Sequence, residues 1–244
     1  MRALIVIPCF NEATRLDRAM VEALLVDARV DILFVDDGST DATREVLGAL
    51  AASAPDRITV HALPKNVGKA EAVRTGLHLG VGRWPIIGFA DADFATPPSE
   101  LLRLLDALVD SEAELVLGSR VLRLGAAIDR SPVRHVIGRV FATVAAMAVG
   151  APVYDTQCGA KWFRVTPAFE AAIAEPFTSR WSFDVELLDR LFGRLPSAVH
   201  TTHEAALEVP LHAWRDVSGS KLNVTSMAKS FAELVGIWAR TKKR

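Results

Sequence analysis

The chain has 244 residues, of which 50% are hydrophobic, and a formal net charge of −1. The balanced charge gives no reason to expect nucleic-acid binding, and the two distant cysteines, Cys9 and Cys158, suggest neither a disulfide framework nor a thiolate zinc site. The uncharged run from Val140 to Tyr154 is shorter than the roughly 20 residues of a membrane-spanning helix. These features predict a cytoplasmic protein that can still touch a membrane surface.

The first half of the chain alternates short apolar runs with segments of helical spacing. The sequence predicts strands at 3–7, 32–35, 58–62, 86–90 and 114–118, and helices at 13–28 and 43–50 and from 97 onward. This alternation predicts an α/β fold with a mostly parallel central sheet and helices on both faces. The loop after the first strand lacks the glycine-rich turn of dinucleotide-binding enzymes, which disfavours a dehydrogenase.

Asp91 and Asp93 follow the apolar run at 86–90, where ligands of open α/β sheets bind. Two ionised carboxylates this close repel each other unless a cation or a hydrogen-bond donor intervenes. Oxygen ligands suit Mg²⁺ or Mn²⁺. The alternative is that both side chains only satisfy turn amides and cap the next helix.

Polar residues also follow the other predicted strands. Asp36 and Asp37 can accept hydrogen bonds from a ribose or a base, although Asp-Gly is also common in turns. Gly68 and Lys69 stand at a predicted helix start, where free amides and the helix dipole attract anions.

The second half is less regular. Segments 155–164 and 180–188 interleave charged and aromatic residues, which a core segment avoids. Residues 223–244 form an amphipathic pattern with a basic tail, predicting a helix that lies on a membrane or packs on the domain. We therefore expect one domain, 1–222, with 223–244 as an appendage.

Five motifs in this order resemble glycosyltransferase family 2, inverting enzymes with the nucleotide-sugar-binding GT-A fold. They are VIPCFNE at 6–12, DDGSTD at 36–41, NVGK at 66–69, DAD at 91–93 and GSR at 118–120. Segments 155–161, 180–188 and 219–222 are similar to the dolichyl-phosphate glucosyltransferase branch, a relative of the dolichyl-phosphate mannose synthases. The mannose synthases carry Gln where this chain has Ala95, which favours UDP-glucose over GDP-mannose as donor.

The resemblance and the residue chemistry together assign the candidate site residues. The residues expected at the donor nucleotide are Pro8, Phe10, Glu12, Asp36, Asp37, Gly68, Lys69 and Asp91. Asp91 and Asp93 are expected to hold Mg²⁺ or Mn²⁺, and the acceptor phosphate is expected at Arg120, Arg130, Arg134 and Lys161. The expected catalytic residues are Asp91, Asp93, Arg120 and Asp184.

The implied acceptor is a polyprenyl phosphate at the cytoplasmic face of a membrane. A phosphate monoester, with a second pKa of about 6, is already largely ionised at neutral pH and needs no general base. Asp184 is then expected to orient the donor sugar or an arginine such as Arg180. Alternatives are a hydroxyl acceptor with Asp184 as base, and a non-catalytic nucleotide-sugar-binding protein. A phosphatase of the haloacid dehalogenase type is disfavoured, because its acidic pair follows the first strand.

Overall fold

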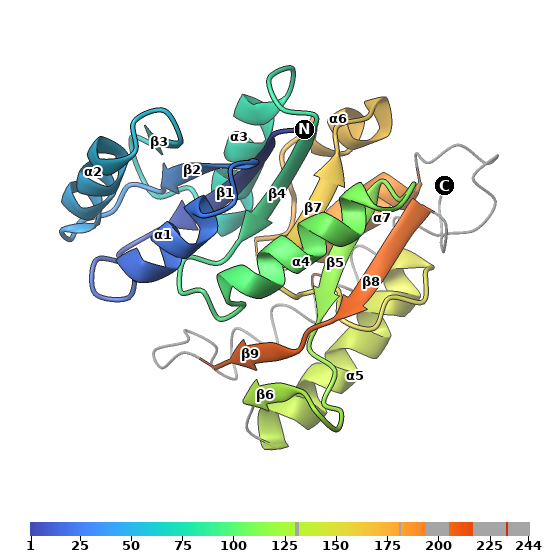
Figure 1. Cartoon of the computed structure of the whole chain (residues 1–244). Helices are drawn as coiled ribbons and strands as arrows, with labels where there is room; N and C mark the ends of the chain where they lie inside the picture. The colour runs from blue at the N-terminus through green and yellow to red at the C-terminus, as the bar shows by residue number, and fades with distance from the viewer. Residues whose placement is uncertain (130–131, 181, 194–204, 217–232, 234–244) are drawn as a thin grey trace.

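A seven-stranded sheet runs through the centre of the computed structural model, in the order β3-β2-β1-β4-β7-β5-β8 (Figure 1). The structure describes residues 1–129, 132–180, 182–193, 205–216 and 233, and only the backbone of 132–137 and 139. The strands of this sheet are β1 (Ala3–Cys9), β2 (Val30–Asp36), β3 (Ile58–Ala62), β4 (Ile86–Ala90), β5 (Leu115–Ser119), β7 (Ala160–Arg164) and β8 (Ala206–Pro210). A smaller sheet pairs β6 (Ala127–Asp129) with β9 (Ala213–Arg215).

The central sheet is parallel except for β7. Strands β2 and β4 pair in parallel with β1, β3 pairs in parallel with β2, and β8 pairs in parallel with β5. Strand β7 lies antiparallel between β4 and β5. The carboxyl ends of β1, β2, β4 and β5 therefore meet at one edge, which is also the edge where β7 begins. The mostly parallel sheet is confirmed, whereas β7 was not predicted.

Helices cover both faces of the sheet, as expected. They are α1 (Arg18–Leu25), α2 (Thr43–Ser53), α3 (Lys69–Gly80), α4 (Pro98–Val109), α5 (Pro132–Val149), α6 (Pro167–Ile173) and α7 (Phe183–Phe192). Residues of α1, α2 and α4 share one buried cluster, and residues of α3, α5, α6 and α7 share the other. Strand β1 supplies Leu4 and Val6 to one cluster and Ile5 and Ile7 to the other. Such two-sided burial explains its continuous apolar sequence.

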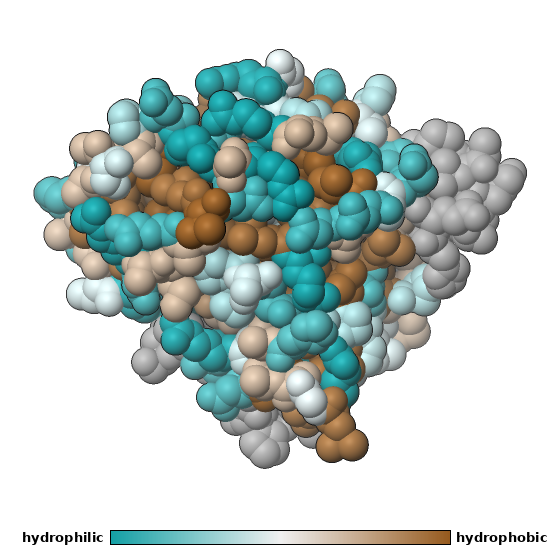
Figure 2. Space-filling model, viewed as in Figure 1, coloured by the Kyte–Doolittle hydropathy of each residue, from teal (hydrophilic) through white to brown (hydrophobic). Residues whose placement is uncertain are grey.

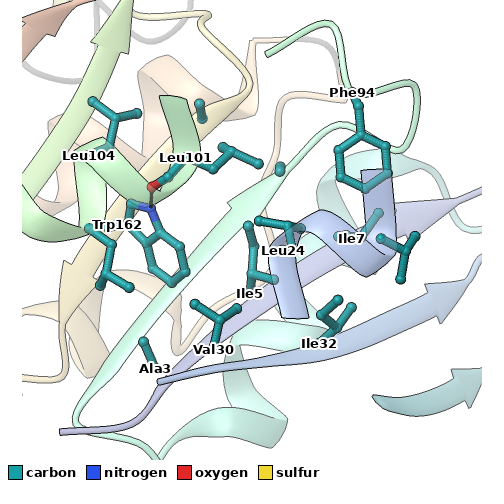
Figure 3. Close-up of a cluster of buried hydrophobic side chains, with 14 of the residues drawn as sticks. Ala3, Ile5, Ile7, Leu24, Val30, Ile32, Phe94, Leu101, Leu104 and Trp162 are labelled. Carbon is teal, nitrogen blue, oxygen red and sulfur yellow. Dashed lines mark hydrogen bonds between the residues drawn. The ribbon is translucent and has the colours of Figure 1, made fainter. Parts of the chain in front are cut away.

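Figure 3 shows the cluster on the α1 and α4 side, where Trp162 of β7 packs beside Leu101 and Leu104. Its indole Nε1 donates to the Leu101 carbonyl at 2.9 Å, the dashed line in the figure. A buried tryptophan thus satisfies its polar atom without water. This bond ties α4 to the strand that separates β4 from β5.

The helix expected at 13–28 is shorter, because Asp17 caps α1 by accepting a hydrogen bond from the Ala19 amide at 2.9 Å. The predicted C-terminal helix, 223–244, lies outside the described residues except for Glu233. Within the described ranges, no helix is long and apolar enough to span a bilayer.

Candidate active site

Asp91 and Asp93 lie on a tight turn at the carboxyl end of β4. The Phe94 amide donates to the Asp91 carbonyl at 3.1 Å, and Phe94 adopts a left-handed φ of 47°. This conformation is strained for an aromatic residue and is held by burial of the ring in the core. The Asp93 Oδ1 atom accepts from the Ala95 amide at 3.1 Å. Burial and the neighbouring Asp91 charge raise the pKa of Asp93.

Gly159, just before β7, lies directly against the Asp91 side chain. A Cβ atom on Gly159 would be 2.2 Å from Asp91 Oδ2, and the Asp91 amide donates to the Gly159 carbonyl at 3.2 Å. Only glycine leaves Asp91 its observed position. Sequence reasoning assigned no role to Gly159.

Lys69 contacts Asp91 from the N-terminus of α3. Its Nζ atom lies 2.5 Å from Asp91 Oδ1, and the two side chains are 43% and 34% exposed. Burial acts to lower the pKa of Lys69, but the carboxylates of Asp91, Asp184 and Asp93 outweigh it and raise that pKa. The ammonium is therefore charged at neutral pH and partly neutralises the acidic turn.

Asp37, beside the end of β2, fixes the loop that leads into α3. Its carboxylate accepts from the Val67 amide at 2.7 Å, the Gly68 amide at 2.9 Å and the Asn66 side chain at 3.0 Å. Burial raises the pKa of Asp37, while these amide hydrogen bonds oppose the change. Gly68 has a φ of +99°, which favours glycine. The structure thus brings Asp37, from the loop after β2, into contact with the loop that ends at Gly68 and Lys69, the start of α3.

Asp36 is fully buried at the end of β2. Its Oδ1 atom accepts from the Ser39 amide at 2.9 Å, and Arg44 Nη2 lies 3.1 Å from Oδ2. The Asp36 carboxylate thus stabilises the turn that follows β2.

The loop after β1 carries the remaining residues expected at the donor. Pro8 lies in β1 opposite Val35 of β2, and Phe10 is half-buried. The Glu12 amide donates to Thr43 Oγ1 at 2.8 Å, and its carboxylate pairs with Arg15 at 2.5 Å. These contacts hold the loop beside the start of α2.

Arg120 follows β5 and forms a two-pronged ion pair with Asp155. The Nε–Oδ2 and Nη2–Oδ1 distances are 2.7 and 2.8 Å, and the Arg120 amide also donates to Oδ2 at 3.0 Å. Burial acts to raise the pKa of Asp155, but the Arg120 guanidinium outweighs it and lowers that pKa to about 2. The carboxylate of Glu208 on β8 accepts a hydrogen bond from the Asp155 amide at 2.6 Å, and this contact holds Asp155 in place.

A pocket lies beside this ion pair, between α5 and the loop before β7. The pocket is small, with a cavity volume of about 20 Å³, and it opens to solvent. The pocket is lined by Arg120, Gly138, Phe141, Ala142, Tyr154, Asp155, Thr156 and Gln157. The Thr156 hydroxyl is buried and has no hydrogen-bond partner within the described part of the chain. An oxyanion entering here would meet a guanidinium and a hydroxyl.

Lys161 and Asp184 form a second buried ion pair. Lys161 on β7 has no exposed surface, and its Nζ atom donates to Asp184 Oδ1 and to the Cys158 carbonyl, both at 2.7 Å. Asp184 lies in the first turn of α7. Lys161, expected at the acceptor phosphate, thus lies in the core, and Asp184 pairs with Lys161 rather than with an arginine.

Two arginines expected at the acceptor cannot be placed with the others. Arg130 lies outside the described residues, and Arg134 belongs to α5, where its side chain is not described. Arg180 lies near the other half of the site, with its Nη2 atom 3.2 Å from where a Gly68 Cβ would be.

The acidic turn fits an incomplete metal site. No group of three or more candidate metal ligands occurs within the described residues, so protein side chains alone do not complete a cage. Mg²⁺ commonly takes one or two protein carboxylates and completes its shell with substrate phosphates and water. Asp91 and Asp93 match that donor set.

The sequence did not predict three sets of contacts in this site. They are the pairing of Asp155 with Arg120 and Glu208, the contact of Gly159 with Asp91, and the pairing of Lys161 with Asp184. The available signal was charge in otherwise apolar surroundings, since Lys161 and Asp184 each sit among aromatic residues. Spacing along the chain gives no indication of which opposite charge such a residue meets.

Comparison with solved structures identifies the fold class as that of the GT-A glycosyltransferases. Glucosyl-3-phosphoglycerate synthase from Mycobacterium tuberculosis aligns with a TM-score of 0.66 at 18% identity, over 98% of this chain and 79% of that one. The mannosyltransferase PcManGT from Pyrobaculum calidifontis, in complex with GDP-Man and Mn²⁺, aligns with a TM-score of 0.60 at 16% identity, over 100% and 64%.

The sequence then gives the family. Residues 4–170 match the model of Glycosyl transferase family 2, and the chain belongs to that family. A dolichyl-phosphate beta-glucosyltransferase from Trichomonas vaginalis is 31% identical over 95% of this chain and 69% of its own length. The polyprenol monophosphomannose synthase of Mycolicibacterium smegmatis is 33% identical over 94% and 84%. The expected fold, family and branch are confirmed, and the chain is a glycosyltransferase.

Proposed function

We propose that this enzyme transfers a hexose from a nucleotide sugar to a polyprenyl phosphate, with UDP-glucose as the preferred donor and GDP-mannose as the alternative. The names of the two sequence relatives support a lipid phosphate acceptor. Ala95, in place of the Gln typical of mannose synthases, supports glucose.

The observation that carries this proposal is the contact of one short loop, 155–159, with both halves of the site. Gly159 lies against Asp91, and Asp155 pairs with Arg120. A donor diphosphate at Asp91 and an anion at Arg120 would therefore be held close to each other. This is the arrangement that transfer between two phosphate-bearing substrates requires.

On the donor side, Asp91 and Asp93 would hold Mg²⁺ or Mn²⁺, which supplies Lewis-acid stabilisation of phosphate charge when bound. The Mn²⁺ in the PcManGT complex supports a divalent ion. The N-terminus of α3, which starts after Gly68, would attract the diphosphate through the helix dipole and the Lys69 ammonium, while the Gly68 amide stays bound to Asp37. Pro8, Phe10, Glu12, Asp36 and Asp37 would shape the nucleoside side of the pocket.

On the acceptor side, Arg120 would hold the phosphate at the pocket beside Thr156, with Arg130 and Arg134 as further candidates. Asp155 fixes the guanidinium in one orientation, which lowers the entropy cost of binding. The phosphate attacks as an anion, so no residue needs to remove a proton in the reaction. In-line attack would invert the anomeric centre.

Asp184 would act by position rather than as a base. Its carboxylate is held by Lys161 inside the core, with little exposed surface. If the acceptor were a hydroxyl instead, Asp184→Asn would lose turnover while keeping donor binding.

The lipid tail needs an apolar surface near this pocket. Leu122 and Leu124, between β5 and β6, are 61% and 100% exposed, and Val140 and Met147 of α5 are also exposed. Figure 2 shows hydrophobic atoms projecting at the lower tip, over the segment before β6. We propose that this tip and the segment 223–244 contact the cytoplasmic face of a membrane.

A thermal-shift panel of UDP- and GDP-sugars, with and without Mn²⁺, tests the donor assignment. A ligand at about 100 times its Kd adds about 2.7 kcal/mol, which raises Tm by roughly 5–10 °C in a domain of this size. We expect the largest rise with UDP-glucose plus Mn²⁺ and none with Asp93→Ala. A rise with GDP-mannose alone would reverse the donor preference, and no rise with any nucleotide sugar would contradict the proposal.

A further inference from the structure

Lys69 forms an ion pair with Asp91, one of the two carboxylates that the proposed function assigns to a metal ion. Its Nζ atom lies 2.5 Å from Asp91 Oδ1, at ion-pair distance. The two side chains are 43% and 34% exposed, so the contact can open without disturbing the core. An ammonium and a divalent ion cannot both bind closely to this oxygen, because like charges repel.

We propose that Lys69 is an exchangeable internal cation. It holds Asp91 while the donor is absent, and it moves to the diphosphate when metal and nucleotide bind together. The inference rests on the proposed function and adds to it a rule for loading the site: metal alone is disfavoured, and metal with nucleotide is favoured.

The position of Lys69 on α3 supplies a destination for its ammonium. Lys69 is the first residue of α3, directly after the Gly68 cap, where helix amides point toward an anion. A diphosphate at this end of α3 lies within reach of a flexible lysine side chain. The diphosphate of the nucleotide thus replaces Asp91 as the anion that pairs with the Lys69 ammonium.

Lys161 shows the contrasting arrangement in the same site. It also pairs with a single carboxylate, Asp184, but has no exposed surface and binds the Cys158 carbonyl as well. Releasing Lys161 would leave a charge in the core, whereas releasing Lys69 places its charge in solvent or on a phosphate. Of these two lysines, only Lys69 is built to exchange.

Mn²⁺ binding followed by electron paramagnetic resonance, without nucleotide and with UDP or GDP, tests this proposal. Lys69→Met should bind Mn²⁺ without nucleotide about tenfold more tightly than the wild type, a typical coupling between sites. The nucleotide should then strengthen Mn²⁺ binding by a smaller factor in the variant. Lys69→Arg should stay close to the wild type, because it keeps the charge.

Arg44→Met is the matched control, since Arg44 pairs with a different strand-end carboxylate, Asp36. It should leave Mn²⁺ affinity unchanged. Lys69→Gln serves as a second variant if Lys69→Met does not fold. Equal Mn²⁺ affinity of wild type and either neutral variant without nucleotide would overturn the proposal. If the wild type binds no Mn²⁺ even with UDP and GDP, the metal site itself is wrong, which is a different failure.

Discussion

The donor and acceptor sides of the proposed active site neutralise their carboxylates in different ways. On the donor side, at the ends of β2 and β4, Asp37 is satisfied by loop amides and Asp91 by a partly exposed lysine. On the acceptor side, around β5 and β7, Asp155 and Asp184 each face a largely buried cation. Exposed ion pairs contribute little to stability and open easily, while breaking a buried pair is costly. The two buried pairs of the acceptor side, Arg120 with Asp155 and Lys161 with Asp184, thus form a fixed frame. On the donor side, Asp91 can exchange Lys69 for another cation.

The strongest way to break this comparison is to remove a cation from the frame. Lys161→Met leaves Asp184 unpaired in the core, and we expect a loss of about 3–5 kcal/mol in the free energy of unfolding, measured by urea denaturation. The double variant Lys161→Met/Asp184→Leu should recover much of it, because no buried charge remains. A loss below about 1 kcal/mol for the single variant would show that the pair is not a frame.

Gly159→Ala tests the contact of the loop 155–159 with Asp91 on the donor side. The added Cβ would displace the flexible Asp91 carboxylate, so we expect sugar transfer to fall by about a hundredfold while the unfolding free energy changes little. Initial rates with a radiolabelled donor measure this. Gly48→Ala in α2 is the control, since its Cβ meets no atom within 4 Å, and it should keep full activity. Unchanged transfer by Gly159→Ala would separate Asp91 from the reaction.

The ion pair of Arg120 and Asp155 should also make the free energy of unfolding depend on pH in the acid range. The pKa of Asp155 is about 2 in the folded state against an ordinary value of 3.8. A depressed folded pKa gives stability that is present above the unfolded value and disappears as pH falls through the folded one. Asp155 should therefore contribute about 2 kcal/mol at neutral pH that is lost between about pH 4 and pH 2. Chemical denaturation across this range, with Asp155→Asn lacking that part of the slope, measures it.

The smallest expected effect belongs to the pair of Arg44 and Asp36, in which Arg44 is exposed and the buried Asp36 keeps the Ser39 amide as a donor when Arg44 is removed. Arg44 is 60% exposed on its side chain, and Arg44→Ala should lower the unfolding free energy by less than about 1 kcal/mol. Urea denaturation at low and high salt measures it, and salt should shrink the difference further. A loss as large as that of Lys161→Met would remove the distinction between the two sides.

The donor side was largely predictable from sequence because its residues follow parallel strands. The apolar runs ending at Asp36 and Asp91 predicted buried strands, and parallel strands bring their carboxyl ends to one edge. Sequence also grouped Gly68 and Lys69 with these carboxylates. It did not predict that Asp37 binds the amides of that very loop, since this contact depends on loop geometry.

The acceptor side was harder to predict because its contacts join distant segments. The antiparallel β7 contains Lys161 and Arg164, so its sequence lacks the continuous apolar run of parallel strands such as β4. From its sequence, Lys161 was predicted to bind the acceptor phosphate. Its actual partner, Asp184, lies 23 residues further along the chain. Pairing across such a distance is decided by packing, which local pattern does not reveal.

The reversed direction of β7 has a consequence for where the chain tolerates change. Because β7 starts at the edge where β4 and β5 end, the peptide just before it contacts both Asp91 and Arg120, and its length sets the separation of the two proposed substrate positions. Inserting even one residue between 155 and 160 would change the separation of the two proposed substrate positions, whereas the space around Gly82 is open, since a Cβ there would meet no atom within 4 Å. Laboratory evolution of this enzyme should therefore accumulate length variation around Gly82 and none in the peptide that leads into β7.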